Sequence, residues 1–251
     1  MRPLASLLCL VLTVVSVTAH AAERNNWAWN NCPTLPGASA NLNYACDGSR
    51  NGAPFRAVMT FISPVDLPAL LRIQMRVFVH SGGLILPHYW RLGVGECREG
   101  NLVFPGDLTG IGTGTTGACQ NPWAGANTIT GSYQYDSHWD NQNGKYNRAD
   151  LHLEIARDTP VSIVAGQRYI AGVIAFDSWS DVDSGTGACI GCATPVSMEF
   201  DVIQFFEVPG SPFDRLSLAQ DDVFLDWQGG ARPLPVSARN ATWGAVKAFY
   251  R

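Results

Sequence analysis

The sequence is poor in charge, and lysine is nearly absent. Only 15% of its 251 residues are charged, and the formal net charge is −4 at pH 7. The basic residues are almost all arginine and form no basic stripe, so nucleic acid is not an expected partner. Hydrophobic residues make up an ordinary 46%, and glycine is abundant, which argues against a disordered chain. The composition indicates a loop-rich β protein.

Beyond the N-terminus the sequence has no long apolar run. No stretch there approaches the ~18 apolar residues of a membrane-spanning helix. The first residues combine Arg2, an apolar run from Leu7 to Val17 and the small-x-small pattern Ala19-His20-Ala21. This is the arrangement of a secretory signal peptide. We therefore expect residues 1–21 to be a signal peptide and the mature protein to be secreted or periplasmic, without a membrane span. An uncleaved N-terminal anchor is the alternative.

Six cysteines follow this leader: Cys32, Cys46, Cys97, Cys119, Cys189 and Cys192. An even number of cysteines outside the cytosol predicts disulfides. Because the cysteines lie in three close pairs, we expect the pairings Cys32–Cys46, Cys97–Cys119 and Cys189–Cys192, although the sequence allows others. The C-x-x-C formed by the last pair is interpreted as a loop staple, since no βαβ pattern surrounds it. Thiol–disulfide exchange and zinc binding are the alternatives.

Period-two alternation of apolar and polar residues dominates the chain. It predicts strands over 55–62, 71–77, 151–155, 168–176, 196–202 and 223–227, separated by turn clusters. Helical signal is scarce: one turn over 67–71 and a C-terminal helix over 242–250, capped by Thr242. We predict an all-β fold, an antiparallel β-sandwich of the Ig-like or jelly-roll type with a short C-terminal helix. The expected parts are a disulfide-closed segment (22–54), the sandwich (55–210) and a C-terminal strand and helix extension (211–251).

Aromatic and amide side chains alternate between residues 121 and 150. Aromatic faces suit the CH faces of a sugar ring, and amides or carboxylates suit its hydroxyls. The predicted ligand-binding residues are Trp123, Tyr133, Tyr135, Trp139, Asp140, Asn143 and Tyr146. A long surface loop whose aromatic side chains fold back onto the sandwich is the alternative.

Three carboxylates, Asp177, Asp181 and Asp183, lie close together in a glycine-flanked segment. Carboxylate oxygens are typical calcium ligands, so these residues are the candidate metal site and calcium the one cofactor considered. The spacing does not match an EF-hand, and a solvated turn is the alternative. His152 and Glu154 share the polar face of one strand, where such a pair can hold zinc or act as acid and base.

The run from Glu199 to Gln204 resembles the strand motif of laminarinase-type jelly-roll glycoside hydrolases. The resemblance implies that Glu199 matches the nucleophile and Asp201 the assisting carboxylate. Gln204 stands where that family has its acid/base glutamate, and an amide cannot donate the required proton. The motif therefore implies a sugar-binding relic of such a site.

The C-terminal half resembles a group of uncharacterised secreted bacterial proteins with an Ig-like or cohesin-like sandwich. The similarity rests on the C-x-x-C followed by a strand, on Trp227-Gln228-Gly229-Gly230 and on the terminal run from Thr242 to Arg251. It implies fold and export, and no activity. We predict a secreted, non-catalytic binding module for a glycan or another cell-surface component. The alternatives are a polysaccharide hydrolase using Glu199, Asp201 or Glu154, and a structural or assembly subunit of the cell surface.

Overall fold

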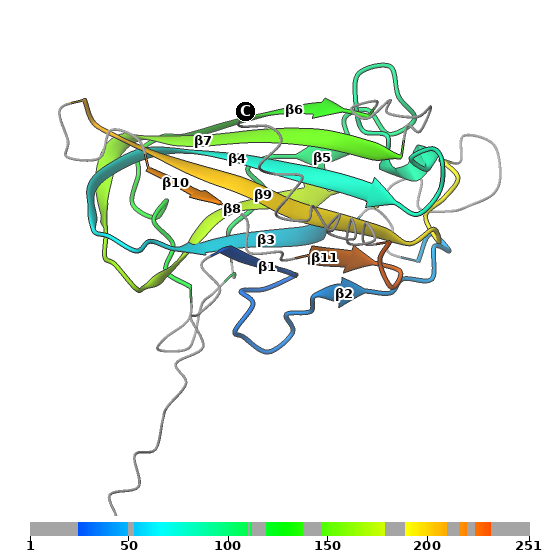
Figure 1. The fold of residues 1–251 in the computed structure, drawn as a ribbon, viewed down its shortest axis with the longest axis horizontal. Helices are drawn as coiled ribbons and strands as arrows, with labels where there is room; N and C mark the ends of the chain where they lie inside the picture. The colour runs from blue at the N-terminus through cyan, green and yellow to red at the C-terminus, as the bar shows by residue number, and fades with distance from the viewer. Residues whose placement is uncertain are drawn as a thin grey trace, which may run out of the picture.

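The computed structural model describes residues 25–49, 53–109, 111, 119–137, 147–178, 189–209, 216–219 (backbone only) and 224–231. These residues form two β-sheets stacked as layers (Figure 1). Neighbouring strands are antiparallel, except that β2 runs parallel to β11. The all-β class predicted from the period-two pattern is therefore confirmed. One 3-10 turn, η1 (His88–Trp90), is the helical element of the described residues.

The smaller sheet has the strand order β1-β3-β8-β5. Its strands are β1 (Asn25–Trp29), β3 (Phe55–Ile62), β8 (Arg168–Phe176) and β5 (Leu102–Val103). The larger sheet has the order β2-β11-β9-β4-β7-β6, and β10 also pairs with β9. Its strands are β2 (Asn41–Leu42), β11 (Phe224–Trp227), β9 (Val196–Glu207), β4 (Leu67–Ser81), β7 (Arg148–Ile163), β6 (Ile129–Asp136) and β10 (Leu216–Ala219).

Aromatic side chains from both sheets interlock in the core. The ring of Trp27 in β1 lies 5.8 Å from that of Phe200 in β9, and the rings of Phe61 and Phe205 are 4.6 Å apart. All four side chains are at most 1% exposed. Burial of these large apolar groups is the main force that holds the two layers together.

Trp227 anchors one end of this core. Its ring lies 4.8 Å from Phe55, 5.5 Å from Trp90 and 5.9 Å from Trp29, with each pair close to edge-to-face. Its indole N–H donates to the carbonyl of Cys192 at 2.6 Å. The buried tryptophan thus keeps its polar atom paired while it joins both sheets to the C-x-x-C turn.

The disulfide pairing predicted from proximity in the sequence is wrong. The bonds are Cys32–Cys119, Cys46–Cys192 and Cys97–Cys189, which join residues 87, 146 and 92 positions apart. The sheet topology brings these distant segments together, with Cα–Cα distances of 5.7 to 6.0 Å. The 22–54 segment is therefore not closed on itself. A bond across a loop of this length stabilises by about 4–5 kcal/mol on the loop-entropy model.

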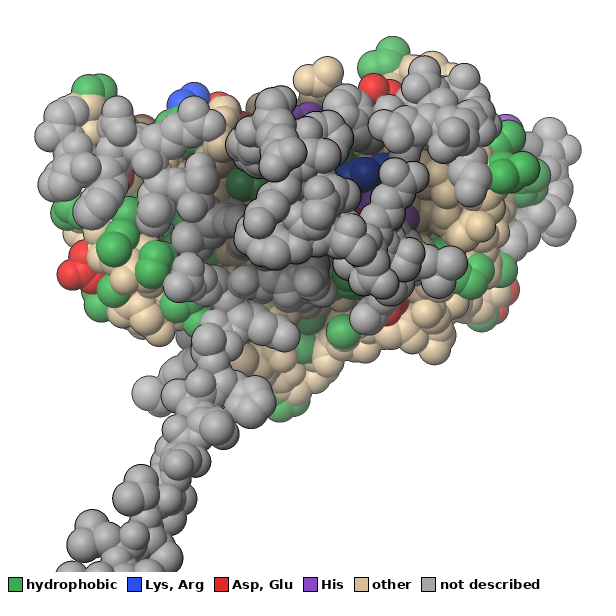
Figure 2. Space-filling model, viewed as in Figure 1, with side chains coloured by type: hydrophobic (Ala, Val, Ile, Leu, Met, Phe, Trp, Pro, Cys, Tyr) green, Lys and Arg blue, Asp and Glu red, His purple; other side chains and the backbone are tan. Residues whose placement is uncertain are grey.

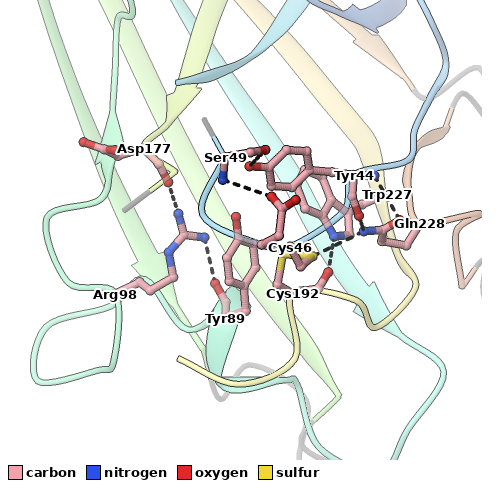
Figure 3. The surroundings of a disulfide bond; sticks show 10 residues. Tyr44, Cys46, Ser49, Tyr89, Arg98, Asp177, Cys192, Trp227 and Gln228 are labelled. Atoms are coloured by element: carbon pink, nitrogen blue, oxygen red, sulfur yellow. Dashed lines mark hydrogen bonds between the residues drawn. A yellow bond between two sulfur atoms is a disulfide. The ribbon is translucent and has the colours of Figure 1, made fainter. Parts of the chain in front are cut away.

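The C-x-x-C is a staple, but it ties two distant segments instead of closing its own turn. Cys192 holds the Tyr44–Cys46 segment, and Gln228 ties it further by donating to the carbonyl of Tyr44 (Figure 3). Between the two cysteines, Gly191 has φ +105°, and a Cβ there would lie 2.5 Å from that of Pro87. Only glycine fits both restrictions.

Most predicted strands are present. The bounds of β3 and β8 are as predicted, whereas β4, β7 and β9 are longer than predicted. The predicted turn over 67–71 is wrong, because these residues begin β4. Both the predicted leader (1–21) and the predicted C-terminal helix (242–250) lie outside the described residues. In the part of the chain that is described, no helix has the length and hydropathy needed to span a membrane.

Candidate functional site

The outer face of the larger sheet carries polar side chains from its central strands. In β4, Met75 is buried in the core, so alternation places Gln74 and Arg76 on the opposite face. In β7, Leu153 is buried, so His152 and Glu154 on either side of it point outward in the same way. Arginine or lysine and histidine side chains lie next to one another on this face of the molecule (Figure 2). The alternation seen in the sequence therefore builds a polar surface.

The strand register aligns these side chains in rows. Glu154 lies opposite Ser132 of β6 and opposite Gln74 of β4, which is itself opposite Gln204 of β9. The next row consists of Gln134, His152, Arg76 and Val202. We call the hollow over these two rows the sheet-face groove; it has a volume of about 540 Å³. Three strand-to-strand steps separate β6 from β9, so the groove spans roughly 14 Å.

Glu154 is fixed at the middle of the sheet-face groove. Its Oε2 accepts a hydrogen bond from the Gln74 amide at 2.5 Å and lies 3.6 Å from an Arg72 guanidinium nitrogen. The Arg72 guanidinium also lies over the Phe206 ring, 4.2 Å from its centre. Because both partners hold the carboxylate, its charge is balanced within the sheet.

Arg76 and Asp150 form an ion pair on this face in which two guanidinium nitrogens bind one carboxylate. The Nε and Nη2 of Arg76 bind the carboxylate at 2.7 to 3.1 Å, and this hydrogen bonding raises the pKa of Arg76. His152 Nε2 lies 3.2 Å from the same carboxylate. The Arg76 guanidinium also covers the Phe78 ring at 4.5 Å. These contacts hold Arg76 flat along the floor of the groove.

A β-bulge in β9 directs the polar side chains near Asp201. Arg76 pairs with Val202 but Val77 pairs with Phe200, so Asp201 is the extra residue. Phe200 and Ile203 are both buried although three positions separate them, which a regular strand does not permit. The bulge therefore shifts the alternation and lets Asp201 and Val202 lie together outside the core.

Burial raises the pKa of the Asp201 carboxyl, and the Arg76 guanidinium 3.9 Å away opposes this effect. Glu199, two residues earlier, is hydrogen-bonded to His80 Nε2 at 2.6 Å. Of the hydrolase-like motif, Val202 and Gln204 line the sheet-face groove, whereas Glu199 and Asp201 are not among its lining residues. The two carboxylates of the motif are thus directed at other protein groups.

The predicted aromatic site does not form as expected in its described part. Trp123 is 1% exposed and donates to the carbonyl of Ile170, and Tyr135 is 9% exposed and donates to the carbonyl of Trp90. Burial raises the pKa of Tyr135. Of the three described aromatics only Tyr133 is exposed, at 37%. The remaining predicted residues, Trp139, Asp140, Asn143 and Tyr146, lie outside the described residues. Both side chains belong to the hydrophobic core: Trp123 binds β8 from the segment before β6, and Tyr135 lies in β6 itself.

The predicted calcium site falls largely outside the described residues, which exclude Asp181 and Asp183. Asp177 is described, and its backbone carbonyl accepts a hydrogen bond from the buried Arg98 (Figure 3). Across the described ranges, no three His, Cys, Asp or Glu side chains are grouped as metal ligands. His152 and Glu154 do share one face, as predicted, but each has a protein partner.

Of the β6 residues that line the groove, sequence reasoning named Tyr133 but missed Ser132 and Gln134. Ser132 and Gln134 were part of a presumed loop, although the alternation of Tyr133 and Tyr135 with polar residues is a strand signal. Gln204 was considered only as a defective acid/base residue. Pairing of β6 with β7 brings Ser132 and Gln134 to the groove, and pairing of β4 with β7 and β9 brings Gln204 there. The sequence pattern does not specify these pairings.

Comparison with known proteins gives no relative. No protein-family model, no curated protein and no solved structure matches the chain. The resemblances drawn from the sequence therefore stay predictions, and function is argued from the groove.

Proposed function

We propose that the protein is an exported, non-catalytic binding module whose ligand is a carbohydrate chain in the sheet-face groove. The observation that carries the proposal is the lining of the groove: two amides, a hydroxyl, an imidazole and a carboxylate on three strands of the sheet, β6, β7 and β9. They belong to Gln134, Gln204, Ser132, His152 and Glu154. Such groups offer both donors and acceptors, which the hydroxyls of a sugar require.

The charges of the groove favour a neutral ligand. Glu154 is held by Gln74 and Arg72, and Arg76 is held by Asp150. Since these charges are already paired within the protein, a charged ligand would gain little binding free energy from them and would compete with the existing contacts. The roughly 14 Å span favours an oligosaccharide over a single sugar.

Export is part of the proposal. Three disulfides suit an oxidising compartment, where such bonds persist. The sequence pattern of a signal peptide points the same way. We also propose that the two stacked, mostly antiparallel sheets are a sandwich of the Ig-like or jelly-roll type. The ligand would then be a glycan or another component of a cell exterior.

The test is a glycan array followed by calorimetry with oligosaccharides of increasing length. Gln134→Ala and Gln204→Ala remove one amide at each side of the groove. Gln120→Ala removes an exposed amide outside it and serves as the control. We expect binding that strengthens with chain length and weakens roughly tenfold in each groove variant, with the control unchanged. Absence of any glycan hit, or equal losses in all three variants, would reject the proposal.

Hydrolysis is a second candidate, favoured by one observation: burial raises the pKa of Asp201, as a proton-donating carboxyl requires. Release of reducing sugar from a glycan that the protein binds, abolished in Asp201→Asn, would establish an enzyme. Binding without turnover in the native protein would leave the non-catalytic function.

A further inference from the structure

Strand β6 is an edge strand of the larger sheet: among the described residues, it pairs with β7 alone. It is the last strand in the order β2-β11-β9-β4-β7-β6 and lies along the border of the molecule (Figure 1). Seven of its eight residues are exposed, all except Tyr135. Its pairing with β7 has no bulge over the whole length. A flat edge without bulge, proline or lysine is the kind that accepts another strand.

The backbone groups that face outward can be identified. The Asp158 N–H donates to the Thr128 carbonyl, which makes 128 and 158 a hydrogen-bonded pair in the register of β6 and β7. Such pairs alternate, so the N–H and C=O groups of Ile129, Gly131 and Tyr133 point away from β7. No backbone partner for these three is found on the free edge in the described chain.

Apolar side chains border this edge. Ile129 and Tyr133 of β6 are 38% and 37% exposed. Val94, in the 92–100 loop next to β6, is 92% exposed. Val103 of β5, 52% exposed, precedes the turn at Pro105 that lies against Gly131. These exposed apolar groups offer contacts to alternate side chains of an added strand.

A second groove, which we call the edge groove, continues from the C-terminal end of β6. It has a volume of about 630 Å³ and lies between β6 and the 92–100 loop. Glu96, Glu99 and Asp136 give it three carboxylates. Ser137, which also lines it, is only 4% exposed, and its hydroxyl has no hydrogen-bond partner in the described part of the chain. A buried hydroxyl without a partner indicates a position for a polar group of a ligand.

We propose that β6 binds an extended basic segment of another protein as an added strand, with a lysine or arginine in the edge groove. The open backbone groups supply the strand pairing, and the carboxylates select the positive charge. A second copy of this chain is a poorer occupant. Two such edges would bring their acidic grooves together, and each chain carries a net charge of −4. The inference does not depend on the proposed glycan function.

The test uses a fluorescent peptide of alternating valine and lysine, as long as the 8-residue β6. The comparison peptides are the same sequence with N-methylated outward amides and a valine–glutamate version. We expect saturable binding of the first peptide, roughly tenfold weaker binding after N-methylation and none of the acidic peptide. Equal binding of the N-methylated peptide would overturn strand addition, and absence of binding by the basic peptide would overturn the whole proposal.

Two variants locate the peptide. Tyr133→Pro removes an N–H that points to the free edge without touching the β7 pairing. Glu99→Gln removes one carboxylate charge from the edge groove. Its control is Asp66→Asn, because Asp66, like Glu99, is exposed and accepts a hydrogen bond from a backbone N–H. We expect Tyr133→Pro and Glu99→Gln to bind the basic peptide more weakly than the native protein does. We also expect Glu99→Gln to melt at the native temperature. Unchanged binding in Glu99→Gln would contradict the charge assignment. A concentration-dependent dimer dissociated by Tyr133→Pro would assign the edge to a second copy instead.

Discussion

Arg76 of β4 holds Asp150 of β7 diagonally across the larger sheet, two residues away from its register partner His152. Asp150 is 2% exposed, whereas the Arg76 side chain is 27% exposed. The carboxylate is therefore removed from water and depends on the guanidinium for compensation. The pair joins the two central strands of the candidate site.

Arg76→Ala should destabilise the protein by about 3 kcal/mol, because it removes the guanidinium and leaves the buried carboxylate with the His152 contact among the described residues. Urea denaturation measures the change. Arg56→Ala, which breaks an ion pair whose side chains are 31% and 58% exposed, is the matched control and should cost less than about 1 kcal/mol. Equal losses in the two variants would contradict the burial argument.

Gly131→Ala should destabilise the protein by about 1–3 kcal/mol through overpacking. An added Cβ would lie 2.1 Å from Pro105 Cδ and 2.9 Å from its nitrogen, so the backbone itself must move. Gly83→Ala, where the nearest atom would be 3.5 Å away, should change stability by less than about 0.5 kcal/mol. Thermal unfolding of both variants checks the position of β6; a native-like Gly131→Ala would show that β6 does not lie there.

Asp201→Asn should stabilise the protein at pH 7. Burial raises the pKa of this carboxyl in the folded state, so its ionisation costs folding free energy as the pH rises from the unfolded value of about 3.9 through the folded value. The amide mimics the protonated form and avoids that cost. Below the unfolded pKa both proteins are uncharged at this position, and the difference should vanish. Melting curves at pH 7 and near pH 3 test this; a gain that persists in acid would contradict it.

The disulfide map is directly testable by digestion of the unreduced protein and mass spectrometry. We expect peptides linked through Cys32–Cys119, Cys46–Cys192 and Cys97–Cys189. In particular, no fragment should contain a closed Cys189–Cys192 ring. Recovery of that ring would contradict the described topology around the C-x-x-C.

The sequence predicts those structural features that are determined by neighbouring residues and not those determined by contacts between distant segments. The strands β3 and β8 and the outward set of β4 follow from period-two alternation, a property of neighbouring residues. The cysteine pairing does not, since it follows from which strands become neighbours in the sheets. Cys46 and Cys192, 146 positions apart, meet only after β2, β11 and β9 are assembled.

The same distinction between local and long-range causes explains why only part of the candidate site was predicted. His152 and Glu154 were correctly placed on one polar face, because they lie in a regularly alternating strand. Trp123 and Tyr135 were misassigned, since aromatic side chains that bind a ligand and aromatic side chains that enter the core give the same composition. The burial of Tyr135 depends on β6 joining the sheet, which no short motif encodes.

The central claim is that a carbohydrate chain occupies the sheet-face groove. The most direct measurement is the ¹H–¹⁵N NMR spectrum of the labelled protein titrated with the best oligosaccharide from the array. We predict that the amides of β4, β6, β7 and β9 that border the groove shift together, with the largest changes near Gln74, Gln134 and Glu154. Shifts absent from these strands, or confined to residues 121–128, would contradict the account.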